Sequence, residues 1–118
     1  MLVLKQQAKQ AECIAYGSVA NLGAEVLAGD PQAKGVELVG KQGDAQIVGV
    51  FGCSEGTFKV EHTFAEHATL VEGRITLTDV KTGTSQTFEA GDSWFIQVGE
   101  VIEWQLHTPM LKHYLAIF

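Results

Sequence analysis

The chain has few cysteines, prolines and basic residues, and each shortage excludes a class of structure or partner. Its 118 residues include two cysteines, two prolines and eight lysines and arginines. Cys13 and Cys53 could pair, but two isolated cysteines do not make a disulfide scaffold, and we expect both to stay reduced. With a net charge of −6 and no basic stripe, the chain is not expected to bind nucleic acid.

Long apolar runs are missing as well. No stretch approaches the roughly 20 apolar residues that span a bilayer, and the apolar run at residues 1–4 is too short for a signal peptide. We therefore expect a cytoplasmic protein with no membrane partner. What the chain does have is a hydrophobic fraction of 46% and 13 glycines, enough for a sizeable core and many tight turns. Its length predicts one domain.

Most of the chain has the pattern of short β-strands. Phe58, Val60 and His62 share one face of the clearest strand, and Lys59 and Glu61 share the other. This period-two alternation with a charged outer face predicts a half-buried strand. Many short strands separated by turns are typical of a sandwich or barrel, whose edges are protected by closure or by dimer formation. Further strands are expected at residues 36–39, 46–51, 74–79, 86–89, 93–98, 101–106 and 111–118.

The N-terminal part is less regular. Residues 5–12 have a helix-favouring composition and could form one short helix or a loose arm. Residues 28–32 have the chemistry of a turn. We expect residues 1–35 to form an N-terminal arm with the first strand or strands, and residues 36–118 to form the barrel of the same domain.

Two glycine-punctuated stretches resemble the paired motifs of the cupin superfamily. In the first, His62, Glu66 and Gly73 keep the family spacing, and the second opens with Gly91 and Asp92. Further pieces between residues 71 and 114 are similar to a small single-domain branch, the cupin domains of ureidoglycine aminohydrolase and of the ethanolamine-utilisation cupin. The resemblance covers roughly residues 36–118. It implies an all-β fold with little helix: a single-domain cupin double-stranded β-helix, or jelly-roll barrel.

The resemblance also implies a metal site, of which this chain keeps half. The family's usual set is three histidines and one glutamate, and His62 and Glu66 match two of these positions. Val60 and Ile102 stand at the other two, and neither side chain can bind a metal. A divalent ion such as zinc, manganese, iron or nickel would need a substitute ligand, and the chain could also work with no metal.

Two histidines could supply the substitute ligand. Extending the inward face of Ile75 and Leu77 backwards along the chain places His67 inside and Glu66 outside, unless a bulge near residues 65–68 reverses the order. His113 would point inward if its face of the last strand is the inner one. The tentative metal ligands are therefore His62, Glu66, His67 and His113.

The inward faces of these strands predict a ligand pocket with an apolar wall and an aromatic floor. We expect it to be lined by Phe58, Val60, Ile75, Leu77, Ile102, Trp104 and Tyr114. Three functions remain open: a small-ligand binding module with a degenerate metal site, a metal-dependent enzyme acting on a small polar ureido or amino compound, and a ligand-free structural or regulatory dimer. The expected partners are a small molecule in the barrel and a second copy in a homodimer.

Overall fold

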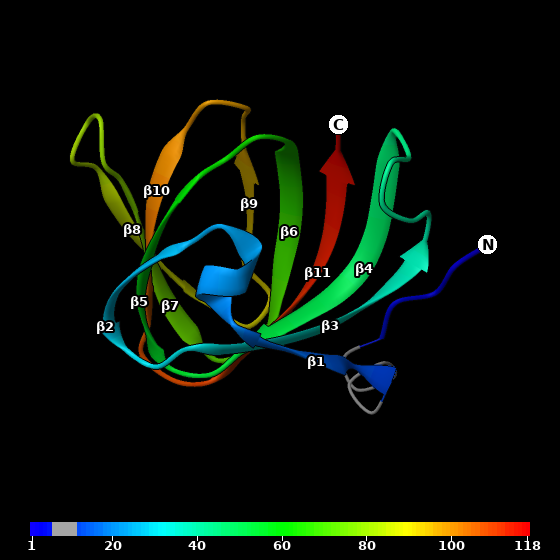
Figure 1. The fold of residues 1–118 in the computed structure, drawn as a ribbon, viewed down its shortest axis with the longest axis horizontal. Helices are drawn as coiled ribbons and strands as arrows, with labels where there is room; N and C mark the ends of the chain where they lie inside the picture. The colour runs from blue at the N-terminus through cyan, green and yellow to red at the C-terminus, as the bar shows by residue number, and fades with distance from the viewer. Residues whose placement is uncertain (6–11) are drawn as a thin grey trace.

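The computed structural model describes residues 1–5 and 12–118 and shows two antiparallel sheets that face each other and close into a barrel (Figure 1). The six-stranded sheet has the order β1-β3-β4-β11-β6-β9, and the five-stranded sheet has the order β2-β5-β10-β7-β8. The elements are β1 (Ile14–Ser18), η2 (Val19–Leu22), β2 (Glu25–Gly29), β3 (Gln32–Val39), β4 (Gln46–Cys53), β5 (Gly56–Glu61), β6 (Ala65–Glu72), β7 (Arg74–Asp79), β8 (Ser85–Glu89), β9 (Ser93–Ile96), β10 (Val101–Leu106) and β11 (Met110–Ile117).

The all-β barrel predicted from alternation and turn spacing is confirmed. Phe58 of β5 lies opposite Trp104 of β10, and their rings stack with centroids 6.0 Å apart. Ile75 of β7 is fully buried in the same core. Among the described residues, no helix is long and apolar enough to cross a membrane, and Cys13 and Cys53 form no disulfide.

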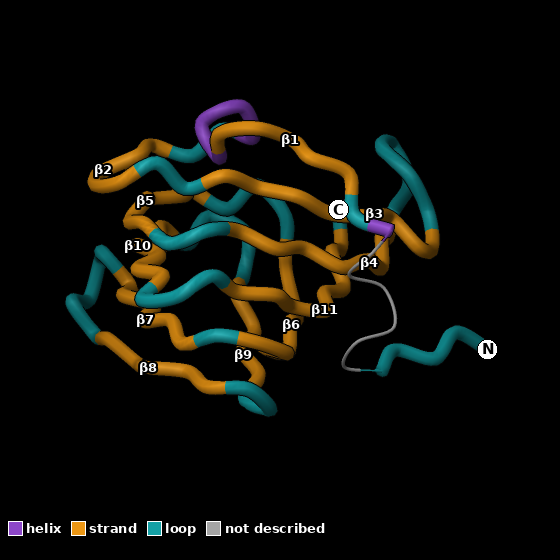
Figure 2. The backbone as a smooth tube through the Cα atoms, turned by 90° about the horizontal axis from the view of Figure 1, so that it is seen from below, coloured by secondary structure: helices purple, strands orange, loops and turns teal. Residues whose placement is uncertain are grey.

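The N-terminal part is more ordered than its sequence pattern indicates. β1 and β2 each extend one sheet, and η2 between them is a single 3-10 turn at one end of the barrel (Figures 1 and 2). The Ser18 side chain caps this turn by accepting a hydrogen bond from the Ala20 backbone. The turn expected at residues 28–32 is shorter, because β2 ends at Gly29 and β3 begins at Gln32. The helix or arm expected at residues 5–12 lies mostly outside the described residues.

A bulge in β6 sets which side chains face the barrel. Leu111 of β11 pairs with Glu72, but the next residue, Lys112, pairs with Leu70, so Val71 is an extra residue in β6. One extra residue reverses the inward and outward faces. Strict alternation backwards from the inward-facing Ile75 of β7 would place Glu66 on the outer face. Because of the extra residue, Glu66 points into the barrel instead. The sequence-based expectation allowed for such a reversal at residues 65–68, whereas the register shift lies at Val71.

Gly73 follows this bulge and is tightly enclosed. Its φ is +100°, and a Cβ placed on it would lie 2.5 Å from the Pro109 carbonyl oxygen. Gly83, in the β7–β8 turn, has a φ of +76° but nothing within 4 Å of such a Cβ. The two glycines thus share a left-handed backbone and differ in the space around them.

Gly73→Ala should therefore destabilise the protein more than Gly83→Ala. Both variants carry the strain of a left-handed alanine, about 1–2 kcal/mol, and Gly73→Ala adds an overpacking cost of about 1–3 kcal/mol. Urea unfolding followed by tryptophan fluorescence measures the difference. Equal losses of unfolding free energy would show that the Pro109 contact is not restrictive.

Candidate functional site

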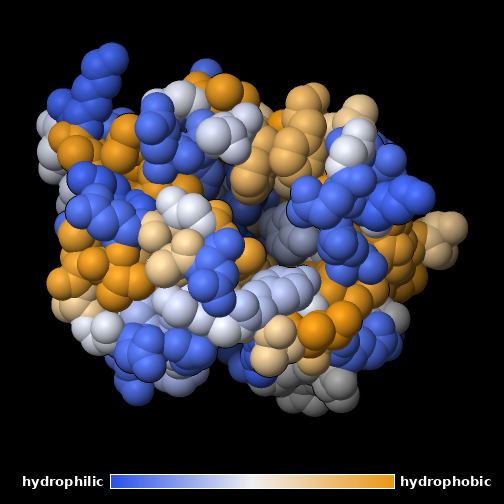
Figure 3. Space-filling view, viewed as in Figure 1, coloured by the Kyte–Doolittle hydropathy of each residue, from blue (hydrophilic) through white to orange (hydrophobic). Residues whose placement is uncertain are grey.

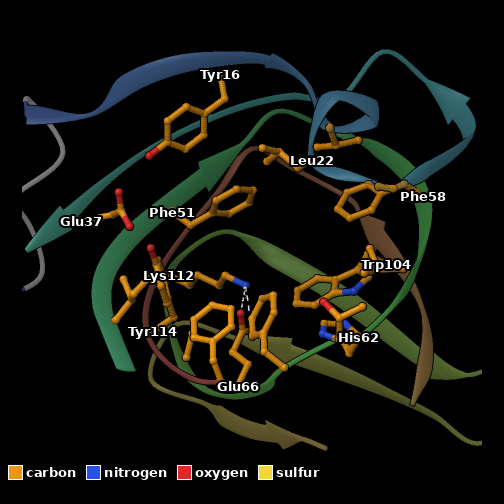
Figure 4. A pocket seen from close by; sticks show the side chains of 18 of the residues that line it. Tyr16, Leu22, Glu37, Phe51, Phe58, His62, Glu66, Trp104, Lys112 and Tyr114 are labelled. Carbon is orange, nitrogen blue, oxygen red and sulfur yellow. Dashed lines mark hydrogen bonds and ion pairs between the residues drawn. The ribbon is translucent and has the colours of Figure 1, made fainter. Parts of the chain in front are cut away.

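The barrel encloses a cavity of about 600 Å³ between the two sheets and η2. Figure 3 shows this face of the molecule hollowed near its centre, and Figure 4 shows the side chains around the hollow. Aromatic rings dominate the wall, and polar groups are few. The lining residues are Tyr16, Val19, Leu22, Ala24, Glu37, Gln42, Ile47, Phe51, Phe58, Val60, His62, Thr63, Phe64, Glu66, Trp104, Lys112, Tyr114, Ala116 and Phe118.

A buried ion pair lies in this cavity. The Lys112 Nζ atom donates to both carboxylate oxygens of Glu66, at 2.8 and 3.0 Å, and the two residues are only 5% and 4% exposed. Trp94 Nε1 also donates to Glu66 Oε1, at 3.2 Å. The three side chains come from β11, β6 and β9, which are neighbours in the six-stranded sheet. Glu66 is therefore held by one cation and one neutral donor. Figure 4 shows its contact with Lys112.

Aromatic rings surround the Lys112 ammonium group. Its Nζ lies 4.5 Å from the ring centre of Trp104 and 5.1 Å from that of Phe51. The ring centres of Trp94 and Tyr114 are 5.9 and 6.0 Å away. The negative faces of aromatic rings attract a cation, most strongly where water is excluded. These rings thus replace part of the hydration that Lys112 loses.

His62 lies on the opposite sheet, just after β5. Its backbone N–H donates to the Glu100 carbonyl at 2.9 Å, and its carbonyl accepts from Gly99 N–H at 2.8 Å. The imidazole packs against Trp104, with ring centroids 6.0 Å apart, and is 5% exposed. Burial lowers the pKa of His62 below its ordinary value of 6.5; the carboxylates of Glu66 and Glu100 oppose this shift and Lys112 reinforces it. His62 is thus neutral near pH 7.

The structure brings together part of the predicted site. Phe58, Val60, Trp104 and Tyr114 line the cavity beside His62 and Glu66. The three other residues expected in the pocket, Ile75, Leu77 and Ile102, are buried in the core without lining it.

The two substitute metal ligands lie elsewhere. His67 is exposed on the outer face of β6. His113 alternates with Lys112 and Tyr114, whose side chains line the cavity, so it occupies the outer face of β11. The proposed convergence of His67 or His113 with His62 and Glu66 does not occur in this structure.

Lys112 is the site residue that the sequence reasoning missed. In β11 the apolar residues Leu111 and Leu115 favoured their own face, with His113, as the inner one. A signal was nevertheless present, because Lys112 is the one charged residue of that strand. A lone lysine on a central strand and a glutamate on the neighbouring strand are a candidate pair, since a buried charge needs a partner.

The residues present do not fit the metal that the fold family implies. Both Glu66 oxygens already accept hydrogen bonds from the Lys112 ammonium, which would also repel a divalent cation. Val60 and Ile102 provide no donor atoms. The described residues contain no group of three or more His, Cys, Asp or Glu side chains that could hold a metal ion. His62 and Glu66 alone fall short of the usual three protein ligands.

The ion pair predicts a specific pattern of stabilities. Lys112→Met leaves the Glu66 carboxylate buried without its cation and should cost about 3–5 kcal/mol of unfolding free energy. The double variant Lys112→Met/Glu66→Gln should recover much of that loss, because no uncompensated charge remains. Lys59→Met is the control, since the Lys59–Glu25 pair is exposed and should contribute less than about 1 kcal/mol. Additive single and double effects in urea unfolding would contradict a coupled pair.

His62 predicts a pH dependence of stability. Below its ordinary pKa of 6.5 the unfolded chain takes up a proton that the folded chain resists, so stability is lost as the pH falls below that value. His62→Phe should flatten this dependence by at most about 1.4 kcal/mol per pH unit. Thermal unfolding from pH 7.5 to 5.5 measures it. Burial also lowers the pKa of His113. The variant His113→Phe therefore separates the contribution of that histidine to the pH dependence from the contribution of His62. An unchanged slope in His62→Phe would show that this imidazole protonates freely.

Comparison with known proteins identifies the family. Residues 40–114 match the family model of the EutQ-like cupin domain, whereas no curated protein matches the chain. The solved structure of a putative ethanolamine utilization protein Q from Salmonella typhimurium is 23% identical, with a TM-score of 0.62 over 75% of this chain and 70% of that one. A protein of unknown function from Pseudomonas syringae pv. tomato is 21% identical, with a TM-score of 0.79 over 96% of this chain and 46% of that one. At these identities the structural likeness shows the fold alone. The family match covers well over half of the sequence, and the chain therefore belongs to the family of EutQ-like cupin domains.

Proposed function

We propose that this cupin domain is a small-ligand binding module that holds its ligand in the barrel cavity without a metal ion. One observation carries the proposal: Lys112 Nζ occupies both oxygens of Glu66, the residue at the family's metal-ligand position. An ammonium group and a divalent cation compete for the same carboxylate. The degenerate motif seen in the sequence thus has a structural counterpart, an ion pair within the protein.

The size and lining of the cavity support a ligand. Small-molecule sites have volumes of roughly 300–1,000 Å³, apolar or aromatic walls and a few placed polar groups. The cavity of about 600 Å³ has this character, with rings such as Phe51, Phe58 and Tyr114 beside Lys112 and Glu66. A ligand-free role would have been favoured by a barrel too small for any ligand, which this one is not.

The other functions predicted from the sequence have less support. A metal-dependent enzyme would need a third ligand, and His67 and His113 both lie outside the barrel. The cytoplasmic location and the homodimer stay predictions. An enzymatic role without a metal would require a nucleophile or base at the cavity, and His62 and Lys112 are the groups to examine if turnover is found.

Ligand-observed NMR and thermal-shift screening of a fragment library, with and without EDTA, test the proposal. We expect fragments that raise the melting temperature equally in both conditions, since a ligand at 100 times its Kd adds about 2.7 kcal/mol. Calorimetric titration with zinc, manganese, iron(II) and nickel should show no stoichiometric binding. Ligands that bind only with a metal would contradict the proposal.

A pair of matched variants locates the binding. Val60→Phe fills part of the cavity and should abolish fragment binding. Val48→Phe makes the same change on β4, at a residue that alternates with the cavity-lining Ile47 and Phe51, and should leave binding intact. Equal binding to both variants would place the fragments outside the barrel.

A further inference from the structure

Three buried nitrogen atoms beside the cavity have no hydrogen-bond partner among the residues that the structure describes. They are Nδ1 and Nε2 of His62 and Nε1 of Trp104, and both rings line the cavity. Native proteins rarely leave buried polar atoms unpaired, and each exception calls for an explanation. The two rings are neighbours, with centroids 6.0 Å apart, so a single polar group could reach both. The three nitrogens thus point to the place where a ligand presents its polar end.

The chemistry of these atoms restricts that polar group. The indole N–H of Trp104 is only a donor, and a neutral imidazole offers one donor and one acceptor. Lys112 adds donors on the same side, since its Nζ lies 4.5 Å from the Trp104 ring and gives two bonds to Glu66. Donors outnumber acceptors, so the ligand group must contain an acceptor oxygen. A cation, which can only donate, would leave Trp104 unsatisfied.

The charges around the cavity disfavour an anion. The charged side chains among the described lining residues are Glu37, Glu66 and Lys112, two carboxylates against one ammonium. Figure 4 shows Glu37 on the side of the cavity away from His62 and Trp104. A ligand carboxylate would bring a third negative charge into a site whose one cation is already paired with Glu66. Desolvating such an anion without a partner of its own is costly.

We propose that the ligand is a neutral molecule with a flat, largely aromatic body and a carbonyl-type oxygen, which accepts a hydrogen bond from Trp104 Nε1 and contacts His62. The aromatic wall takes the body, and the Lys112–Glu66 pair lies beside the polar end. The three nitrogens are covered by neighbouring atoms in this conformation, so binding includes a shift of the side chains around them that uncovers the atoms the ligand contacts. This assignment rests on the proposed function and adds the class of ligand to it.

Four naphthalene probes that differ only in their polar end test the assignment. They are 2-naphthamide, which is neutral with a carbonyl oxygen; 2-naphthoate, an anion; 2-naphthylmethylammonium, a cation; and 2-methylnaphthalene, which has no acceptor. Tryptophan fluorescence and thermal shift give the affinities near pH 7. We expect the amide to bind at least about tenfold more tightly than the other three, the discrimination that one well-made hydrogen bond provides.

Variants identify the atoms that read the carbonyl group. Trp104→Phe keeps an aromatic ring but removes Nε1, and it should reduce the preference for the amide over the hydrocarbon by about threefold to tenfold. His62→Phe should also reduce it, whereas the same substitution at His113, on the outer face, should leave the preference unchanged. A preference that survives both Trp104→Phe and His62→Phe would overturn the assignment.

The remaining outcomes separate this assignment from the proposed function. Equal affinity for the amide and the hydrocarbon, expected if trapped water satisfies the nitrogens, overturns the assignment and leaves cavity binding in place. Tighter binding of the naphthoate or the ammonium probe does the same. If none of the four probes binds while other fragments still occupy the cavity, the assignment alone fails. If the fragment screen is silent as well, both fail.

Discussion

The buried contact between Lys112 and Glu66 is the constraint on which the interior of this barrel depends. Two charges taken out of water require a close mutual contact and further polar or aromatic neighbours. Trp94 provides the additional donor to Glu66, and the rings of Trp104, Phe51 and Tyr114 surround the ammonium group. Much of the aromatic lining can thus be understood as the environment that makes an internal charge pair tolerable.

The same contact changes what the cupin framework can do. The barrel still directs His62 and Glu66 inward, as the family spacing implies, but the carboxylate that could bind a metal is bound by a lysine. The interior then has no net charge from this pair. Under the proposed function, a ligand would be selected by its shape and its hydrogen-bonding pattern, because the pair presents no unbalanced charge to attract an ion.

The sequence predicted the barrel well because its strands alternate clearly. Phe58 and Val60 on β5, and Trp104 on β10, were placed correctly by period two alone. β11 misled the same reasoning because both of its faces are buried: Lys112 and Tyr114 face the cavity, while Leu111 packs in a second cluster with Val50 and Val71 on the other side. When both faces of a strand are buried, alternation cannot say which one faces the cavity.

Glu66 shows a different limit. Its orientation follows from the bulge at Val71, and nothing in the local sequence around that residue marks an extra position. A single added residue reverses every side chain before it. Contacts made far along the chain, with β11, decide the register. The sequence also could not predict that the ring nitrogens of His62 and Trp104 lack hydrogen-bond partners among the described residues. Hydrogen bonding of a buried side chain depends on which residues surround it in the folded protein.

The position of β11 has a consequence for assembly. It follows every other described strand in the sequence, yet it lies between β4 and β6 in the middle of the six-stranded sheet. During synthesis, β4 and β6 each have an unpaired edge until residues 110–117 have been made. Glu66 likewise has no lysine partner until Lys112 has been added. Such long-range strand pairings form slowly, and until they form the unpaired strand edges are prone to aggregation. The same strand, β11, therefore supplies both the pairing that joins β4 to β6 and the cation that pairs with Glu66.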